Sequence, residues 1–313
     1  MSGNSTPSFS RHATLDAILR LVLYFDVFQH PLHQTELERL VCPGRPDLIQ
    51  ESCDTLRKKQ LLEETHRFWH RPGAQRWVVR RQTRTRCAEK VWPIARRSAA
   101  ILSGMPFVEG VLITGGMSKN STTPDNDIDF LLLVTPNRVW SIKTITQALR
   151  RVLPHKYREQ FCTNYIMATD AMPLSSRNLF TAIELSTAVP MHGPTACARL
   201  LMENQWVKQF VPGFSWSIQR AQAAPKRKSS RPVRALEATW RGPGALNIEQ
   251  WALKGWNQYW NSKYNWLSQA QRSKRFQRTP STATNHLHDF QNYVLRETQA
   301  RFEEVGLKEE LSL

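Results

Sequence analysis

The stretch 110–135, GVLITGGMSKNSTTPDNDIDFLLLVT, constrains the fold of this chain more than any other part of it. Two apolar runs, Val111–Thr114 and Phe130–Val134, have the length and the branched or aromatic content of buried strands. Asp127 and Asp129 open the second run, and residues i and i+2 of a strand point the same way. The sequence therefore predicts two carboxylates side by side at the edge of a small sheet.

Two like charges a few Å apart repel each other, so such a pair is costly unless a cation lies between them. Oxygen ligands suit Mg²⁺, which takes its remaining ligands from water and from substrate phosphates. Gly115 and Gly116 precede the connection, and glycine lets the backbone approach a ligand closely and offer N–H groups to a phosphate. The stretch thus predicts a metal–nucleotide site, with Asp127 and Asp129 as metal ligands. The alternative is a β-hairpin whose aspartates only solvate a strand end.

A glycine pair, a spacer and Asp-x-Asp on a strand together resemble the signature of the DNA polymerase beta-type nucleotidyltransferase superfamily. The resemblance covers about 107–174 and implies a domain that binds a nucleoside triphosphate such as ATP with Mg²⁺ and transfers a nucleotidyl group. The usual serine after the first glycine is here Gly116. Taken alone, Lys143 is explained better as a surface charge. The nucleotide-binding candidates that the resemblance implies are Gly115, Gly116, Ser118, Lys119 and Lys143.

The third strand of this predicted sheet is the segment Arg158–Ala168. In the superfamily this strand often carries a third carboxylate, which helps to hold the metal or acts as a base. Here Glu159 lies at the edge, and Asn164 is the candidate for the third catalytic position. An amide can coordinate through its oxygen but cannot take up a proton. Either another group serves as base, or the site binds nucleotide and turns over slowly.

The N-terminal part predicts three short helices followed by a two-stranded hairpin, the element order of a winged helix-turn-helix. It is similar to the winged-helix segment that precedes a nucleotidyltransferase domain in some uncharacterised bacterial proteins. Thr14 is predicted to cap the first helix, and Thr35 with Glu38 forms a capping-box pattern for the second. The predicted helices are 14–28, 36–41 and 48–59, and the predicted strands are 61–64 and 76–79.

The net charge of +17 favours a polyanionic partner, most often nucleic acid, with RNA preferred here over DNA. Arginine suits forked contacts to phosphates, although basic side chains also solvate helix faces. A winged helix can equally pack against protein, so its fold does not settle its role. The nucleic-acid-binding candidates are Arg76, Arg80, Arg81 and Arg84 after the hairpin, and Lys226, Arg227 and Lys228 in the basic run 219–234.

The C-terminal third predicts helices at 178–188, 197–210 and 289–305, with 219–234 as a basic linker. Trp251, Trp256, Trp260 and Trp266 follow at roughly helical spacing. Such tryptophans can stack bases, but core or interface roles are more common for them. This region is therefore also a candidate interface for a protein partner.

The expected fold class is α+β. The expected domains are a disordered tail 1–12, a winged helix 13–85, a nucleotidyltransferase-like small mixed sheet with helices 86–190, and a helical C-terminal region 191–313. Five scattered cysteines without a CxxC motif favour reduced thiols in a cytoplasmic protein over a disulfide framework or zinc site. No apolar stretch approaches the ~20 residues of a membrane span, and the N-terminus lacks the apolar core of a signal peptide.

Two functions follow. In the first, the chain is a Mg²⁺-dependent nucleotidyltransferase that moves a nucleoside monophosphate from a triphosphate to an acceptor, with an RNA end preferred over a protein or small molecule. In the second, it is a weakly active or inactive nucleotidyltransferase-like protein that binds nucleic acid, alone or as a component of a multi-protein complex. The absence of a mid-strand third acid and the glycine at position 116 support the second, but the first is the preferred interpretation.

Overall fold

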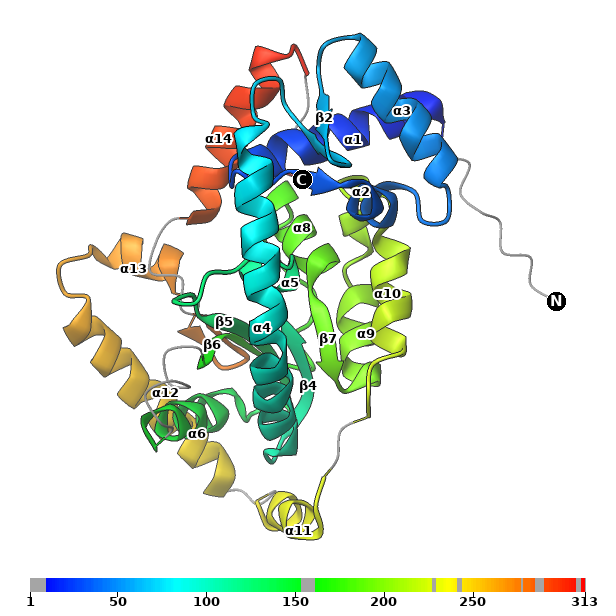
Figure 1. Ribbon diagram of the computed structural model, residues 1–313. Coiled ribbons are helices and arrows are strands. Elements are labelled where there is room, and N and C mark those ends of the chain that lie inside the picture. Colours follow the sequence, from blue (N-terminus) through cyan, green and yellow to red (C-terminus); the bar gives the residue numbers. More distant parts are fainter. Residues whose placement is uncertain are drawn as a thin grey trace.

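The computed structural model describes residues 10–152, 161–226, 229–240, 244–276, 278–284, 290–307 and 311–312. Helices surround a central six-stranded sheet, which confirms the expected α+β class. The longest described helix, α4 (Arg76–Gly104), runs from the N-terminal helices down past the sheet (Figure 1).

The N-terminal part has the three predicted helices and a small antiparallel sheet of strand order β1-β3-β2. Ser10 caps the first helix in place of Thr14, by accepting from the Ala13 N–H at 3.2 Å. The capping box of the second helix is His33 with Glu36 rather than Thr35 with Glu38. The elements are α1 (Arg11–Asp26), β1 (Leu32–His33), α2 (Gln34–Val41), α3 (Pro46–Lys58), β2 (Glu63–Thr65) and β3 (Phe68–His70).

The predicted strand 76–79 is wrong, because these residues form the first turn of α4. The hairpin is shorter than expected, since β2 pairs with β3 across a turn at His66 and Arg67, which both have positive φ angles. Val78 is buried while Val79 is 68% exposed. The burial of Ala74, Val78 and Arg81 follows a helical repeat. The adjacent apolar residues at 78–79 do not by themselves distinguish a helix from a strand.

The helix α4 continues without a break across the expected domain boundary between residues 85 and 86. Its C-terminal half packs against the central sheet through small and medium side chains on one face. These buried side chains are Ala88, Val91, Ala95, Ala99 and Leu102. The helix therefore links the N-terminal part rigidly to the sheet.

The central sheet is mixed and has the strand order β7-β4-β5-β6-β9-β8. Strand β5 pairs with β4 in antiparallel fashion and with β6 in parallel, so it is a central strand. The three strands predicted from the sequence are confirmed as β4, β5 and β6. The strands are β4 (Val108–Ile113), β5 (Ile128–Val134), β6 (Phe161–Ala168), β7 (Val189–His192), β8 (Arg278–Thr279) and β9 (Thr282–Thr284).

The two faces of the sheet pack against different helices. Phe130 and Leu132 of β5 face a core shared with α4, α6 (Val139–Val152) and α12 (Gly244–Lys263). Leu131 and Leu133 face the other core, which includes α8 (Leu179–Thr187) and the N-terminal helices. Alternation along β5 places the side chains of Asp127 and Asp129 on this second side, toward α8.

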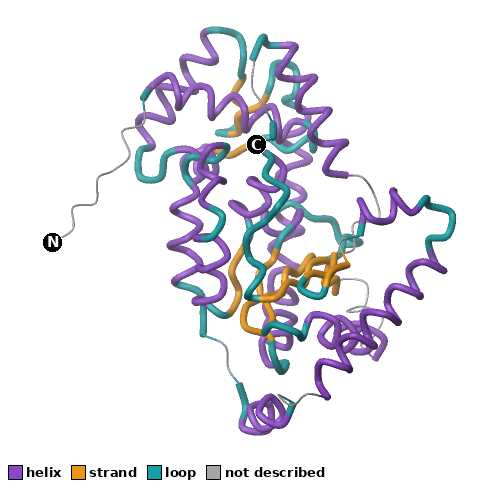
Figure 2. Tube along the Cα trace, turned by 180° about the vertical axis from the view of Figure 1, so that it is seen from behind, coloured by secondary structure: helices purple, strands orange, loops and turns teal. Residues whose placement is uncertain are grey.

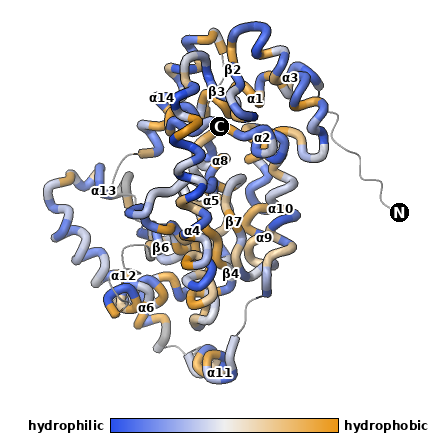
Figure 3. The backbone as a smooth tube through the Cα atoms, viewed as in Figure 1, coloured by the Kyte–Doolittle hydropathy of each residue, from blue (hydrophilic) through white to orange (hydrophobic). Residues whose placement is uncertain are grey.

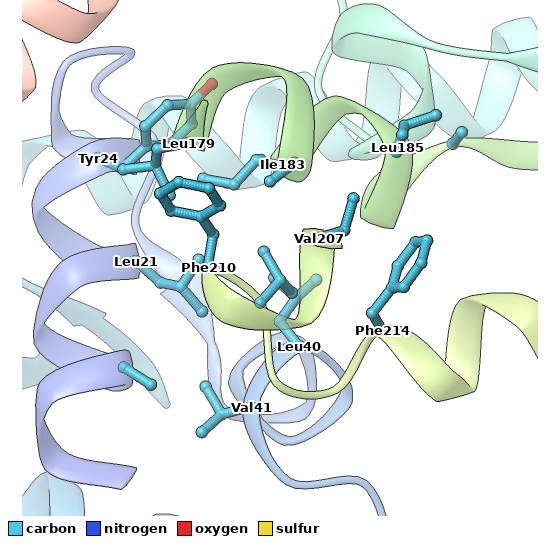
Figure 4. Close-up of a cluster of buried hydrophobic side chains, with 14 of the residues drawn as sticks. Leu21, Tyr24, Leu40, Val41, Leu179, Ile183, Leu185, Val207, Phe210 and Phe214 are labelled. Atoms are coloured by element: carbon cyan, nitrogen blue, oxygen red, sulfur yellow. The ribbon is translucent and has the colours of Figure 1, made fainter. Parts of the chain in front are cut away.

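The N-terminal helices share their core with a segment far along the chain. Figure 4 shows Leu21 and Tyr24 of α1 and Leu40 and Val41 of α2 beside side chains of 179–214. The labelled partners are Leu179, Ile183, Leu185, Val207, Phe210 and Phe214. The N-terminal helices and the segment 179–214 are therefore parts of one hydrophobic core in this structure.

The C-terminal region is helical, as expected, but its basic linker is shorter. Helix α10 runs to Gln222 and α11 begins at Arg231, so both ends of the predicted linker 219–234 are helical. The final helix packs on α1, where Arg301 donates to Asp26 at 2.8 Å. The elements not yet given are α9 (Pro194–Met202), η1 (Gln205–Gln209), α10 (Phe214–Gln222), α11 (Arg231–Thr239), α13 (Gln269–Arg275) and α14 (Phe290–Glu304).

Helices α12 and α13 lie on the opposite side of the sheet from α9 and α10, as the front and back views both show (Figures 1 and 2). Hydropathy colouring shows the hydrophobic residues gathered on the central strands (Figure 3). The tryptophans of α12 divide between core and surface. Trp260 is buried and lies 6.1 Å from Trp140 between ring centroids, whereas Trp251 and the following Trp266 are 76% and 67% exposed.

Helix α6 is capped by a carboxylate from α12. The buried side chain of Glu249 accepts from the Trp140 and Ser141 N–H groups, both at 2.9 Å. Replacing Glu249 by alanine leaves two buried N–H groups without an acceptor, so we expect the free energy of unfolding to fall by about 2 kcal/mol. Urea unfolding measures this, with the exposed Glu89→Ala as the control. Equal midpoints for the two variants would contradict the capping role.

Candidate functional site

A glycine bend lies between the first two core strands, where β4 ends and the short helix α5 (Gly115–Ser118) begins. Gly115 has a φ of +64°, and a Cβ atom at this position would lie 2.2 Å from Asp129 Oδ2. A Cβ at Gly116 would lie 2.5 Å from the Ser121 carbonyl oxygen. Both positions thus require glycine, and the bend lies directly against the carboxylate of Asp129.

The two aspartates lie at the start of β5 as predicted. Asp127 is exposed and precedes the strand, whereas Asp129 is half-buried within it. Burial raises the pKa of Asp129 from 3.8 to about 7, and the negative charges of Glu184 and Asp127 add to this effect. The ionised form of Asp129 is therefore unfavourable here, and a positive charge nearby would stabilise it.

Asn164 lies beside the pair, on the neighbouring strand β6. Its side-chain amide donates to Asp129 Oδ1, and its own Oδ1 accepts from the Cys162 thiol at 2.8 Å. The parallel pairing of β5 with β6 sets Cys162 opposite Asp129, which brings the residue two positions on to the same side. The structure therefore brings together the three residues that were predicted to be catalytic.

A further carboxylate at this site, Glu184 of α8, was missed by the sequence reasoning. Its Oε2 accepts from the Gly115 N–H at 3.2 Å, and its Oε1 pairs with Lys119 Nζ at 2.8 Å. After burial, the negative charge of Glu184 does most to raise the pKa of Asp129. The sequence signal for Glu184 is that it is the single acid in the apolar helix LFTAIELST, a position where an unpaired charge is costly.

The predicted phosphate-binding residues of α5 contact the bend itself. Ser118 Oγ donates to the Gly115 carbonyl oxygen at 2.8 Å, and Lys119 Nζ donates to the same oxygen at 3.0 Å. Lys119 also lowers the pKa of Asp129 by its positive charge. Gly115, Ser118 and Lys119 are thus close to the carboxylates.

Lys143 lies elsewhere, buried between α6 and the sheet. Its amine donates to the Thr163 carbonyl oxygen at 3.2 Å and lies 5.8 Å from the centre of the Trp260 ring. This is the α12 side of the sheet, opposite to the side that carries the aspartates. Burial lowers the pKa of Lys143 to about 8. The structure does not bring Lys143 to the acidic pair.

The predicted nucleic-acid-binding residues are only partly on the surface. Arg76 and Arg80 are exposed, with guanidinium carbons 4.6 and 5.6 Å from the centre of the Trp77 ring. Arg84 is half-buried and Lys226 is exposed, whereas Arg227 and Lys228 lie outside the described residues.

Arg81 is the exception in this group, because it is buried. Its guanidinium pairs with Glu36 at 2.9 Å and donates to the carbonyl oxygens of Asn120 and Lys119, at 3.0 and 3.3 Å. The expectation that Arg81 contacts nucleic acid is therefore replaced by a structural role. It ties α2 and α4 to the end of α5.

Within the described ranges, no group of three or more His, Cys, Asp and Glu side chains has the geometry of a metal site. In the same part of the chain, no helix is both long enough and apolar enough to cross a membrane. Comparisons with protein-family models, curated proteins and solved structures found no match to this chain.

Proposed function

We propose that the chain is a Mg²⁺-dependent nucleotidyltransferase. The observation that carries this proposal is the placement of Asp129, two residues after Asp127, against a glycine bend, with Glu184 bonded to the bend and Asn164 bonded to Asp129. A carboxylate buried among other carboxylates is repelled by them, and this repulsion costs stability. Such a residue is therefore more often functional than structural.

The arrangement of elements supports the same proposal. A strand, a glycine bend with a short helix, and a second strand that opens with Asp-x-Asp are in the order expected from the superfamily resemblance. The N-terminal order of α1, β1, α2, α3, β2 and β3 is the order of a winged helix, which supports that part of the resemblance as well.

The residues present suit a magnesium ion. Asp127 and Asp129 would hold it, and their mutual repulsion and the raised pKa of Asp129 would both be offset by its charge. The ion would supply charge neutralisation on the phosphates during in-line displacement. With two protein carboxylates as ligands, the remaining positions would be filled by water and triphosphate oxygens, as is usual for Mg²⁺.

The chain's own side chains have separate tasks in this proposal. Asn164 orients Asp129 through its amide, which leaves the other carboxylate oxygen for the ion. Glu184 holds the bend by accepting from Gly115 N–H, and it fixes the amine of Lys119 beside the bend. Lys119 is then positioned to neutralise phosphate charge.

The acceptor that suits the surface best is RNA. Helix α4 exposes a series of basic side chains, and the net charge of the chain is +17. Phosphate contacts from such residues give binding that falls steeply with salt. The exposed basic residues of α4 are Arg76, Arg80, Arg86, Lys90, Arg96 and Arg97.

This RNA contact makes a prediction about the exposed pair on Trp77. The double change R76Q/R80Q is expected to reduce the slope of log affinity for RNA against log salt by about 2, because each phosphate contact contributes about 1. Filter binding at KCl concentrations from about 50 to 300 mM measures the slope. The double change K208Q/K254Q, which removes two exposed charges outside both α4 and the run 219–234, is the charge-matched control. An unchanged slope would remove α4 from the RNA-binding surface.

Transfer itself is tested with labelled triphosphates, Mg²⁺ and cellular RNA. We expect label to enter RNA with the wild-type chain and to stay at background with D127A and D129A. If the wild type shows no more transfer to RNA, protein or small molecules than these variants, the proposal fails.

A second candidate function is a nucleic-acid-binding protein with little or no turnover. Its support is that Gly115 N–H is already bonded to Glu184, and one oxygen of Asp129 to Asn164, so a triphosphate and a metal would have to displace or share these contacts. The exposed Trp251 and Trp266 offer a surface for a protein partner in this case. Salt-sensitive RNA binding that D127A/D129A leaves intact, without transfer, would select this function.

A further inference from the structure

A cavity of about 160 Å³ is lined by residues of the N-terminal helices, of α10 and of the segment 118–120. Ser118 of α5 and the following Lys119 line it, together with Arg39 of α2 and Arg220 of α10. None of Asp127, Asp129 and Asn164 is among its lining residues. The cavity therefore adjoins the acidic site, with which it shares Ser118 and Lys119, but it does not include the carboxylates of that site.

Two guanidinium groups in this cavity lie against one indole ring. The guanidinium carbons of Arg39 and Arg220 are 5.2 and 4.7 Å from the centre of the Trp216 ring. Each arginine is half-buried, and burial, with a smaller effect from the charge of Arg39, lowers the pKa of Arg220 to about 10. Like charges brought together in a partly buried place are costly without a counter-charge.

The described part of the chain does not supply that counter-charge. The polar contacts of Arg39 and Arg220 there are backbone carbonyl oxygens, those of Thr35 for Arg39 and of Thr187 and Ala188 for Arg220. Arg220 Nε is buried and has no acceptor among the described residues. Glu36 also lines the cavity, but its two oxygens are bonded to Arg81 and to His33 N–H.

We propose that this cavity binds a phosphate monoester. Two arginines with unused donors match a dianionic group with three acceptor oxygens, and forked guanidinium contacts favour phosphate. The other lining residues are a mixture of polar and apolar side chains, and Phe25, Leu32, Trp92 and Trp216 among them suit the organic part of the ester. The source is either a free nucleoside monophosphate or the 5′-phosphate of an RNA end.

The experiment is calorimetric titration of the full chain in EDTA, which removes binding that depends on a divalent ion at the acidic pair. The probes are AMP, a 5′-phosphorylated RNA octamer and the same octamer with a 5′-hydroxyl. We expect saturable binding of AMP, of the phosphorylated octamer, or of both, and weaker binding of the hydroxyl octamer. Binding of AMP alone assigns the cavity to a free nucleotide, and binding of the phosphorylated octamer alone assigns it to an RNA end.

Variants separate this site from the catalytic proposal. R39Q should weaken phosphate binding about tenfold, the loss expected for one charged hydrogen bond. R39K should retain more of the affinity, and K208Q, which removes an exposed charge outside the cavity, should retain all of it. No saturable binding of any phosphorylated probe, or equal binding by wild type and R39Q, overturns the proposal. Binding that D129N abolishes and R39Q does not would assign the phosphate to the acidic pair instead, and would also overturn it.

Discussion

Asp129→Asn is expected to abolish nucleotidyl transfer and at the same time to stabilise the fold above pH 7. Under the proposed function, the loss of transfer follows because asparagine would remove a charged metal ligand worth several kcal/mol in the transition state, or about a thousandfold in rate. The gain in stability follows because the charge of Asp129 is held in a buried place near Glu184 and Asp127. Because this charged residue lowers the stability of the fold, its replacement by a neutral residue of the same shape is expected to raise that stability.

The gain in stability of D129N over the wild type is expected to increase with pH. Asp129 has an unfolded pKa of 3.8 and a folded pKa of about 7, so the folded chain holds its proton over a window in which the unfolded chain has released it. The free energy of unfolding of the wild type therefore falls as pH rises through this window. D129N lacks that fall, so its advantage should be near zero at about pH 4 and should reach on the order of 2 kcal/mol above pH 7.5.

Urea unfolding of both proteins at several pH values measures the difference. D125N, in the same connection but exposed, is the control and should show no such pH-dependent gain. Added Mg²⁺ should narrow the difference between wild type and D129N, because an ion that binds only the folded wild type stabilises it. A D129N variant that is less stable than the wild type at pH 8 would contradict the electrostatic description of the site.

Glu184→Gln is expected to lower the transfer rate about 10- to 100-fold, the usual effect of losing a residue that orients a catalytic group. Glutamine can still accept from Gly115 N–H but does not pair with the charge of Lys119. Because Glu184 raises the pKa of Asp129, the same change should move the acidic limb of the pH–rate profile to lower pH. A residue with a merely structural role would not move that limb.

The profile is measured with labelled nucleoside triphosphate between about pH 5 and 9, the range in which shifted carboxylates and ordinary histidines titrate. E203Q, which breaks the exposed ion pair with Arg199, is the matched control for the loss of a glutamate charge. A reduced rate with an unmoved limb would limit Glu184 to holding the bend. An unchanged rate would remove it from the site.

Much of the site could be predicted from the sequence because its signals are local. Asp127, Ile128 and Asp129 alternate along one strand, and the glycines lie in the connection just before it, so spacing alone places them together. Asn164 came instead from the family resemblance, which puts the third catalytic position on the strand that follows, and the structure sets that strand parallel to β5.

The rest depends on contacts between distant segments. Glu184 reaches the bend only because α8 packs across the sheet, and Arg81 is buried only because α2 and α5 both meet α4. The beginning of α4 was missed for a different reason. Residues 76–79 contain three consecutive apolar side chains, Trp77, Val78 and Val79, which fit a short strand and a helix equally well, and tertiary packing decides between them.

The most direct test of the central claim is a Mn²⁺ titration followed by electron paramagnetic resonance, with a non-hydrolysable nucleoside triphosphate present. Asp127 and Asp129 should create a site that binds Mn²⁺ together with the triphosphate in the wild type, and D127N/D129N should lose it while remaining folded. Equal Mn²⁺ binding by wild type and D127N/D129N would show that the paired aspartates do not hold a metal–nucleotide complex.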